Sequence, residues 1–185
     1  LNTLTHHLYR PSEHLNAVCI AGRSRAAPHD NNETVAISLS DSIPASIPLI
    51  LATKGIERGS LMLMSEVIAS ILPHNPCGIL SGPNFAREAA AGLPTATTLA
   101  IRQPHLAEQI TFALGGKYFR LYVNADPVGT QIGGAVKNVL AIAAGIVEGR
   151  GLGENARAAL IARGYAEMLR FGLARGGRAE TLAGL

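Results

Sequence analysis

The pattern of apolar and polar residues becomes regular from residue 46 onward, where short apolar runs alternate with segments of helical periodicity. The run IPLILATKG is continuously apolar and ends in Gly55, which predicts a strand buried on both faces. The segment GSLMLMSEVIASILP has apolar residues at helical spacing and ends at Pro73, which predicts a helix that this proline terminates.

The same alternation continues to about residue 126. Strands are predicted in CGILSG, TATTLAI and YFRLYV, and helices in PNFAREAAAG and HLAEQITFALGG. In PNFAREAAAG, Pro83 would lie near the first helical turn and Gly92 after the last one. Strands that alternate with helices in this way are typical of βαβ units and indicate a mostly parallel sheet.

The pattern changes after Asp126. Residues 127–149 and 155–175 read as two long helices joined by GRGLGEN, with Asn155 as the expected cap of the second helix. The final stretch GGRAETLAGL predicts a turn and the start of a third helix. A boundary near residues 124–128 therefore separates an α/β part from an all-α part.

Residues 1–45 have a weaker pattern, in which AVCIAG and TVAISL are the only expected strands. His6, His7, His14 and His29 lie there without the spacing of metal ligands, so we favour exposed loop histidines and predict no metal site.

Composition restricts the class of protein. Apolar residues make up 48% of the chain and charged residues 16%, which is typical of a globular protein with a hydrophobic core. The net charge is +3, the basic residues are scattered and Trp is absent, so a nucleic-acid surface is disfavoured. Cys19 and Cys77 form neither a metal motif nor a disulfide framework, which favours reduced thiols in the cytosol. No apolar run reaches about 18 residues and no secretory signal is recognised, so no membrane insertion is expected.

The stretch QIGGAVKNVLAIAAGIVEG places a charged lysine, Lys137, in a helix that otherwise looks buried. On a helical projection Gly133, Gly134, Ala141 and Ala144 fall within about 60° of Lys137, because each residue turns about 100°. The bulky residues fill most of the other side of the helix. A face of small residues lets a neighbouring helix or a ligand approach the backbone closely.

Two interpretations of Lys137 remain open at this point. The lysine can extend from a buried helix to water. Alternatively it is functional, in which case burial lowers the pKa of its ammonium group and allows proton transfer near neutral pH.

Two further segments are candidates for chemistry. Lys54 lies at the carboxyl end of a predicted parallel strand, where open α/β sheets bind ligands, although a lysine that merely ends a strand is equally compatible. In LSGPNFA a strand ends at Ser81 and a turn through Gly82 leads to a predicted helix start, whose free N–H groups would attract phosphate. An ordinary βα turn has the same pattern. Cys77 lies in an apolar strand and is interpreted as a core residue.

Taken together, LATKGIERG, LSGPNFAREAAAGLPTATTLA and IGGAVKNVLAIAAGIVEGRGLGENARAALIARGYAEMLRFG resemble the bacterial NAD(P)-dependent glycerol-3-phosphate dehydrogenase family. The resemblance runs from about residue 46 to residue 185. It implies part of a Rossmann-type parallel sheet over 46–126, which is the C-terminal part of an NAD(P)-binding domain. The start of a helical, substrate-binding C-terminal domain would follow over 127–185, and residues 1–45 would be unmatched.

The resemblance also implies a reaction and a set of site residues. Family members interconvert dihydroxyacetone phosphate and sn-glycerol 3-phosphate with NAD or NADP, which supplies glycerol 3-phosphate for phospholipid synthesis. By this resemblance Lys137 is the catalytic acid/base and also binds substrate. Substrate would further contact Lys54, Gly82 and Asn84, and the cofactor would contact Lys54, Ala86 and Asn138. A cytoplasmic homodimer is expected.

The sequence departs from the family pattern at three places. Asn84 stands where bacterial members usually have Ser or Thr. No glycine-rich GxGxxG turn occurs in residues 1–45, and the chain ends before the family's substrate-binding Asp and Arg-Asn segment. We therefore expect a fragment that is truncated at both ends. The alternatives are a non-catalytic relative of this family or a 3-hydroxyacid or ketopantoate-type reductase.

Overall fold

The computed structural model describes residues 18–20 and 43–184. Short strands and helices alternate in the first part of this region and long helices follow. In chain order the elements are β1 (Val18–Ile20), β2 (Leu49–Leu51), α2 (Met64–Ile71), β3 (Cys77–Ser81), α3 (Ala86–Ala90), β4 (Thr95–Ala100), α4 (Pro104–Leu114), β5 (Phe119–Asn124), α5 (Pro127–Gly149), α6 (Glu154–Ala174) and α7 (Ala179–Ala183). The strand expected in AVCIAG is confirmed as β1, whereas the one expected in TVAISL lies outside the described residues.

The strands form one sheet in the order β1-β2-β3-β4-β5. The pairs β1/β2, β2/β3 and β4/β5 are parallel, and β3/β4 is antiparallel. The antiparallel pair arises because α3, between β3 and β4, has no buried residues and does not pack on the sheet as a crossover helix. The α/β class and the mostly parallel sheet are therefore confirmed.

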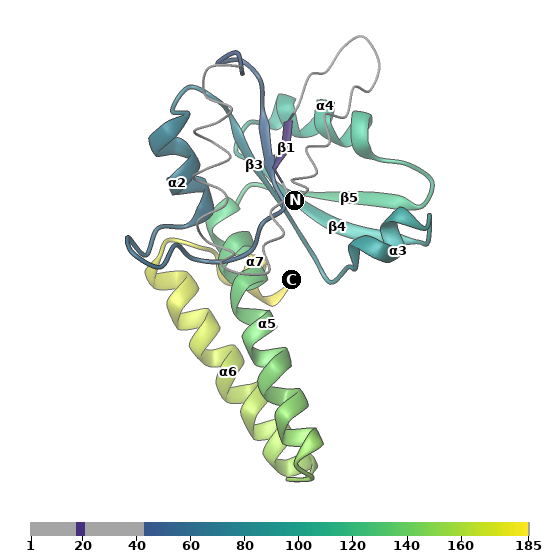
Figure 1. The fold of residues 1–185 in the computed structure, drawn as a ribbon, viewed down its shortest axis with the longest axis vertical. Helices are drawn as coiled ribbons and strands as arrows, with labels where there is room; N and C mark the ends of the chain where they lie inside the picture. Colours follow the sequence, from purple (N-terminus) through teal and green to yellow (C-terminus); the bar gives the residue numbers. More distant parts are fainter. Residues whose placement is uncertain (1–17, 21–42, 185) are drawn as a thin grey trace, which may run out of the picture.

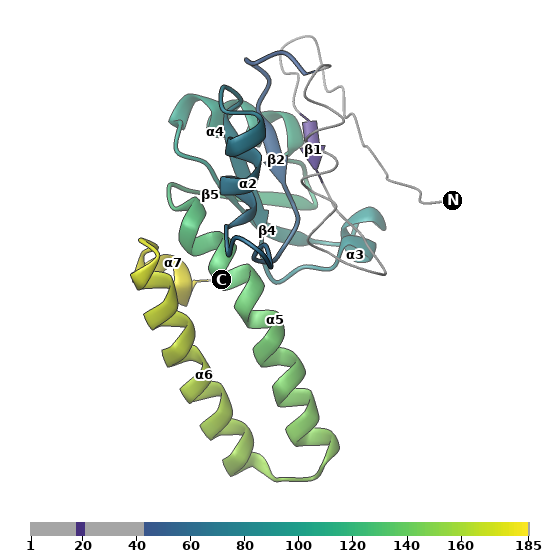
Figure 2. The same ribbon diagram turned by 60° about the vertical axis from the view of Figure 1, so that its left-hand side comes forward.

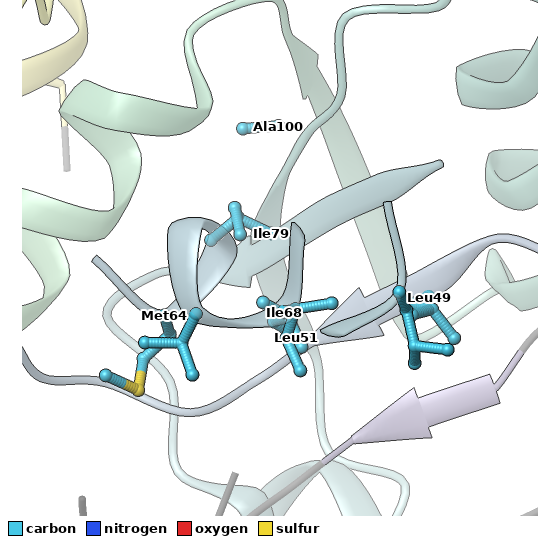
Figure 3. Packing of buried hydrophobic residues seen from close by; sticks show 8 residues of the cluster. Leu49, Leu51, Met64, Ile68, Ile79 and Ala100 are labelled. Atoms are coloured by element: carbon cyan, nitrogen blue, oxygen red, sulfur yellow. The ribbon is translucent and has the colours of Figure 1, made fainter. Parts of the chain in front are cut away.

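Helices cover both faces of the sheet (Figure 1). Leu49 and Leu51 of β2 pack with Ile68 of α2 in one core cluster, shown in Figure 3. Ile50, between them on the strand, belongs to a second cluster with Ile110 of α4. Alternate side chains of one strand thus enter opposite layers. This arrangement explains the continuous apolar run and confirms a strand that is buried on both faces.

α5 and α6 form an antiparallel hairpin that extends away from the sheet, and α7 returns to the base of α5 (Figures 1 and 2). A third apolar cluster joins these helices to the α/β layers. Its buried members are Leu63, Ile132, Met168 and Leu182. β5 ends at Asn124 and α5 begins at Pro127, at the position where we placed the domain boundary; the domain division itself stays a prediction.

The burial of α5 changes along its length. Its buried residues all lie between Pro127 and Gly134, whereas Val139, Ile142 and Ile146 are exposed. The interpretation of the whole segment as a buried helix is therefore wrong for its second half. By length and composition alone, α5 could also cross a membrane. Core helices of soluble proteins meet the same criterion. The absence of membrane insertion stays a prediction.

Two local predictions are wrong. α3 begins at Ala86, so Pro83 lies in the preceding turn and not in the first helical turn. The cap of α6 is Gly153, with φ 85°, and not Asn155. In the first case, the turn between Ser81 and Ala86 is longer than expected, so the proline does not occupy the first helical position. In the second case, the residue before α6 has a positive φ. Glycine adopts this conformation without steric cost, whereas asparagine adopts it less readily.

Candidate active site

Lys54 follows the carboxyl end of β2 and is partly buried. Gly55 comes next with φ 145°, a backbone conformation that favours glycine. The loop that begins there is closed by Glu57, whose backbone N–H donates to the Met62 carbonyl oxygen at 2.8 Å. The Glu57 carboxylate also accepts the backbone N–H of Gly59 at 3.0 Å. These bonds order the loop that follows Lys54, which lies at the sheet edge where parallel strands end.

The end of β3 lies at the same edge, because β2 and β3 are parallel neighbours. Ser81 is 4% exposed, and its carbonyl oxygen accepts the Thr97 hydroxyl at 3.0 Å. Gly82 has no room for a side chain, since a Cβ there would lie 3.1 Å from the Thr97 Cα. The Asn84 amide donates to the Ala96 carbonyl oxygen at 3.3 Å, which fixes the turn against β4.

The first half of α5 is fixed by buried polar contacts. The Asp126 carboxylate caps the helix by accepting the Gly129 N–H at 2.8 Å. The Gln131 amide donates to the Ser65 hydroxyl at 2.8 Å and accepts the Ser65 N–H at 3.0 Å, which ties α5 to α2. The helix therefore presents one defined face to the ends of β2 and β3.

At Gly134, α5 approaches the sheet edge closely. A Cβ at this position would overlap the Ser81 Oγ and lie 3.9 Å from the Lys54 Cε. The small-residue face that the sequence predicted thus receives Ser81 and Lys54 from two strand ends. It does not serve to pack a second helix at this point.

Lys137 lies one helical turn beyond Gly134. Its Nζ is buried and has no hydrogen-bond partner among the described residues. Burial lowers the pKa of Lys137, and the nearby positive charge of Lys54 lowers it further. Burial also lowers the pKa of Lys54. An extension of Lys137 into water is therefore wrong, because the ammonium group itself is covered.

The structure thus brings Lys54, Ser81 and Lys137 around Gly134, with Gly82 directly after Ser81. The other predicted site residues are more exposed, so a ligand could contact them. Ala86, the first residue of α3, and Asn138 are exposed, and Asn84 is partly exposed. Their predicted roles in binding stay predictions.

The Ser81 side chain is a feature that sequence analysis missed. Its Oγ is buried and unpaired within the described part of the chain. The one available signal was its place as the last strand residue before a glycine turn. That signal is weak, since serine is common at such positions.

Cys77 of β3 is partly buried and packs against the core cluster that β2 and α2 share. Burial raises the pKa of its thiol to about 12, so the reactive thiolate is suppressed. Across residues 18–20 and 43–184 no group of His, Cys, Asp and Glu side chains is arranged to hold a metal ion.

The two lysines are expected to lose their protons at lower pH than a lysine in an unstructured peptide. Lys54→Met should raise the pKa of Lys137, because it removes the repulsion between the two charges. The free energy of unfolding should rise with pH between the lowered pKa of the folded lysines and about 10.4, since the unfolded chain binds more protons there. The pH dependence of reductive methylation, followed residue by residue by mass spectrometry, measures both pKa values. Unchanged Lys137 titration in the Lys54→Met variant would show that the two charges do not interact.

Comparison with known proteins identifies the family of the chain. Residues 24–107 match the family model for the NAD-dependent glycerol-3-phosphate dehydrogenase N-terminus, and residues 126–185 match the model for its C-terminus. Glycerol-3-phosphate dehydrogenase [NAD(P)+] of Paramagnetospirillum magneticum is 52% identical over 178 residues, which are 96% of this chain and 58% of the relative. Glycerol-3-phosphate dehydrogenase [NAD(P)+] 1 of Sphingopyxis alaskensis is 56% identical over 147 residues, 80% of this chain and 44% of the relative.

Solved structures give the same result. The crystal structure of glycerol-3-phosphate dehydrogenase from Coxiella burnetii superposes with a TM-score of 0.78 at 44% identity, and the match covers 83% of this chain and 47% of that one. The chain spans about half the length of the curated relatives that it matches. With sequence models matching both parts of the chain and a shared fold, the chain belongs to the NAD-dependent glycerol-3-phosphate dehydrogenase family.

Proposed function

We propose that this site interconverts dihydroxyacetone phosphate and sn-glycerol 3-phosphate with NAD or NADP. The observation that carries the proposal is the covered ammonium group of Lys137, which has no acceptor within the described residues and lies near a second lysine. Burial of an unpaired charge is costly, so such a group persists where a ligand supplies the acceptor. A phosphorylated substrate with a carbonyl oxygen meets that requirement.

Lys137 acts as the acid/base in this proposal. The nicotinamide cofactor supplies the hydride for the ketone carbon when it is bound. As negative charge develops on the ketone oxygen, the Lys137 ammonium donates its proton to that oxygen and is left as a neutral amine. In the oxidative direction the neutral amine accepts the proton of the hydroxyl group. The lowered pKa of Lys137 supports both directions, because it makes the neutral amine accessible nearer to neutral pH.

The other predicted residues bind the substrate and orient it. Lys54 provides a positive charge for the substrate phosphate, which its place at the carboxyl edge of the sheet supports. Gly82 and Asn84 would contact the substrate from the turn after β3, which packs closely against Thr97 because Gly82 has no side chain. Exchange of the usual Ser or Thr for Asn84 retains a hydrogen-bonding side chain.

The residues present fit a dinucleotide cofactor at this edge. The two lysines attract an anionic, oxygen-rich group, and the Lys137 Nζ has no acceptor among the described residues, which supports this fit. Lys54, Ala86 and Asn138 would hold the cofactor, and the last two are exposed and available for contact. A cytoplasmic location, a homodimer and a supply of glycerol 3-phosphate for phospholipid synthesis belong to the same proposal.

The test is oxidation of NADH or NADPH by the purified chain, followed by absorbance with dihydroxyacetone phosphate as substrate. Unphosphorylated dihydroxyacetone is the matched control and should react far more slowly, because it offers no partner to Lys54. Absence of any substrate-dependent oxidation, with sn-glycerol 3-phosphate still bound, would favour the non-catalytic relative over the enzyme.

Lys54→Met is expected to raise KM for dihydroxyacetone phosphate by at least about tenfold, the scale of one charge-assisted hydrogen bond. Methionine keeps an unbranched side chain, one atom shorter than that of lysine, and removes the ammonium group with its charge and its donors. Steady-state kinetics with varied substrate measures the effect, and Lys117→Met, an exposed lysine beside Tyr118, is the control. An unchanged KM would remove Lys54 from the phosphate site.

A further inference from the structure

The Ser81 side chain is a buried polar group that the proposed function leaves unused. Ser81 is the last residue of β3 and is 4% exposed. Its Oγ has no hydrogen-bond partner within the described ranges. Buried hydroxyl groups in native proteins are nearly always paired, so an unpaired one needs an explanation.

The position of this hydroxyl is closely determined. The Thr97 hydroxyl donates to the Ser81 carbonyl oxygen at 3.0 Å and holds the end of the strand. On the other side α5 comes so close that a Cβ at Gly134 would overlap the Ser81 Oγ. The hydroxyl therefore lies between the strand end and the helix, with little freedom to move elsewhere.

Two lysines lie on the elements that border this hydroxyl, and their charges interact with each other. Lys137 follows Gly134 by one helical turn, and its Nζ is likewise buried without a partner. The Lys54 Cε lies 3.9 Å from the position of a Gly134 Cβ. One hydroxyl and one ammonium group, both unpaired, thus lie on neighbouring elements around one glycine. Donors in this state are satisfied when a single oxygen atom of a ligand lies between them.

We propose that the Ser81 hydroxyl is a substrate-binding group that donates a hydrogen bond to the oxygen that Lys137 protonates. This inference rests on the proposed function of the site. As the ketone oxygen gains charge, the hydroxyl and the ammonium group both donate to it, and the serine retains its own proton. Thr97 and Gly134 are the positioning residues that keep the hydroxyl in place.

The inference makes an unusual prediction for stability. In the absence of ligand, Ser81→Ala should leave the melting temperature unchanged or raise it, because the variant removes a buried hydroxyl that has no partner in the part of the chain that the structure describes. Thr97→Val should lower the melting temperature, because its hydroxyl is paired. Thermal unfolding of both variants without ligand measures this contrast. A drop for Ser81→Ala as large as that for Thr97→Val would show a structural role and overturn the inference.

Ligand binding and turnover complete the test. Ser81→Ala should weaken binding of sn-glycerol 3-phosphate by about tenfold, the scale of one hydrogen bond, and leave binding of inorganic phosphate unchanged in calorimetric titrations. It should lower kcat by about 100-fold, the scale of one oxyanion donor, with a smaller change in KM. Ser81→Thr, which keeps the hydroxyl, should recover part of kcat. Ser70→Ala on α2, whose hydroxyl bonds the Val67 carbonyl oxygen, is the control.

The remaining outcomes bear either on the role of Ser81 alone or on the proposed function as well. Equal weakening of phosphate and sn-glycerol 3-phosphate would place the hydroxyl on the phosphate and refute its role at the reacting oxygen. Normal kcat in Ser81→Ala, with active wild type, would refute the inference alone and leave Lys137 in its role. Wild-type protein that neither binds sn-glycerol 3-phosphate nor oxidises NADH would overturn the proposed function and this inference together.

Discussion

Replacement of Lys137 by methionine is expected to reduce turnover by at least about 100-fold, the usual contribution of a general acid–base group. Methionine fills similar space but can neither donate a proton nor stabilise a developing negative charge. The buried ammonium group has no partner in the described structure, so the variant should fold at least as stably as the wild type. Loss of activity would then reflect lost chemistry and not lost structure.

The measurement is the rate of NADH oxidation with dihydroxyacetone phosphate at saturating concentrations, together with a melting temperature for each protein. Lys117→Met is the matched control and should retain wild-type turnover, because Lys117 is exposed and lies against the Tyr118 ring. A Lys137→Met variant with near-normal turnover would eliminate Lys137 as the acid/base and with it the proposed mechanism.

Among these variants, Asp126→Ala is expected to lower the free energy of unfolding the most. The Asp126 side chain is 5% exposed and accepts two backbone N–H groups, from Gly129 at 2.8 Å and from Arg178 at 2.7 Å. It therefore caps α5 and joins the start of that helix to the start of α7. Loss of the cap and of a second bond to a charged acceptor should lower the free energy of unfolding by about 2–4 kcal/mol.

Urea unfolding measures this change. Glu148→Ala provides the control, since the Glu148 side chain is 73% exposed and its ion pair with Arg157 spans 4.0 Å. Such a surface pair contributes no more than about 1 kcal/mol. If the two variants differ by less than that, Asp126 does not hold α5 to α7 as described.

The sequence predicted the elements around the site well where periodicity was strong. α5 was expected over residues 127–149 and has those bounds, because its apolar residues recur over many turns and Pro127 starts it. Prediction failed at short turns. Whether Pro83 or Gly153 begins a helix depends on local backbone angles, which the apolar periodicity does not encode.

Candidate site residues show the same division. Lys54 and Lys137 were found from their places, one at the end of a strand and the other on a face of glycine and alanine. Ser81 was overlooked, because a serine that ends a strand carries no sign of whether its hydroxyl is paired. Its hydroxyl has no partner among the described residues, which depends on how α5 packs against β3 at Gly134 and therefore on the tertiary structure.

The sequence by itself determined the order of strands and helices and the small-residue face beneath Lys137. These features are local, since apolar periodicity and the absence of a side chain act within one segment. Only the tertiary structure decided that Lys54, Ser81 and Lys137 meet. The physical reason is that burial and hydrogen-bond satisfaction depend on neighbours distant in sequence, so the environment that lowers the pKa of Lys137 exists only after α5 packs against the sheet edge.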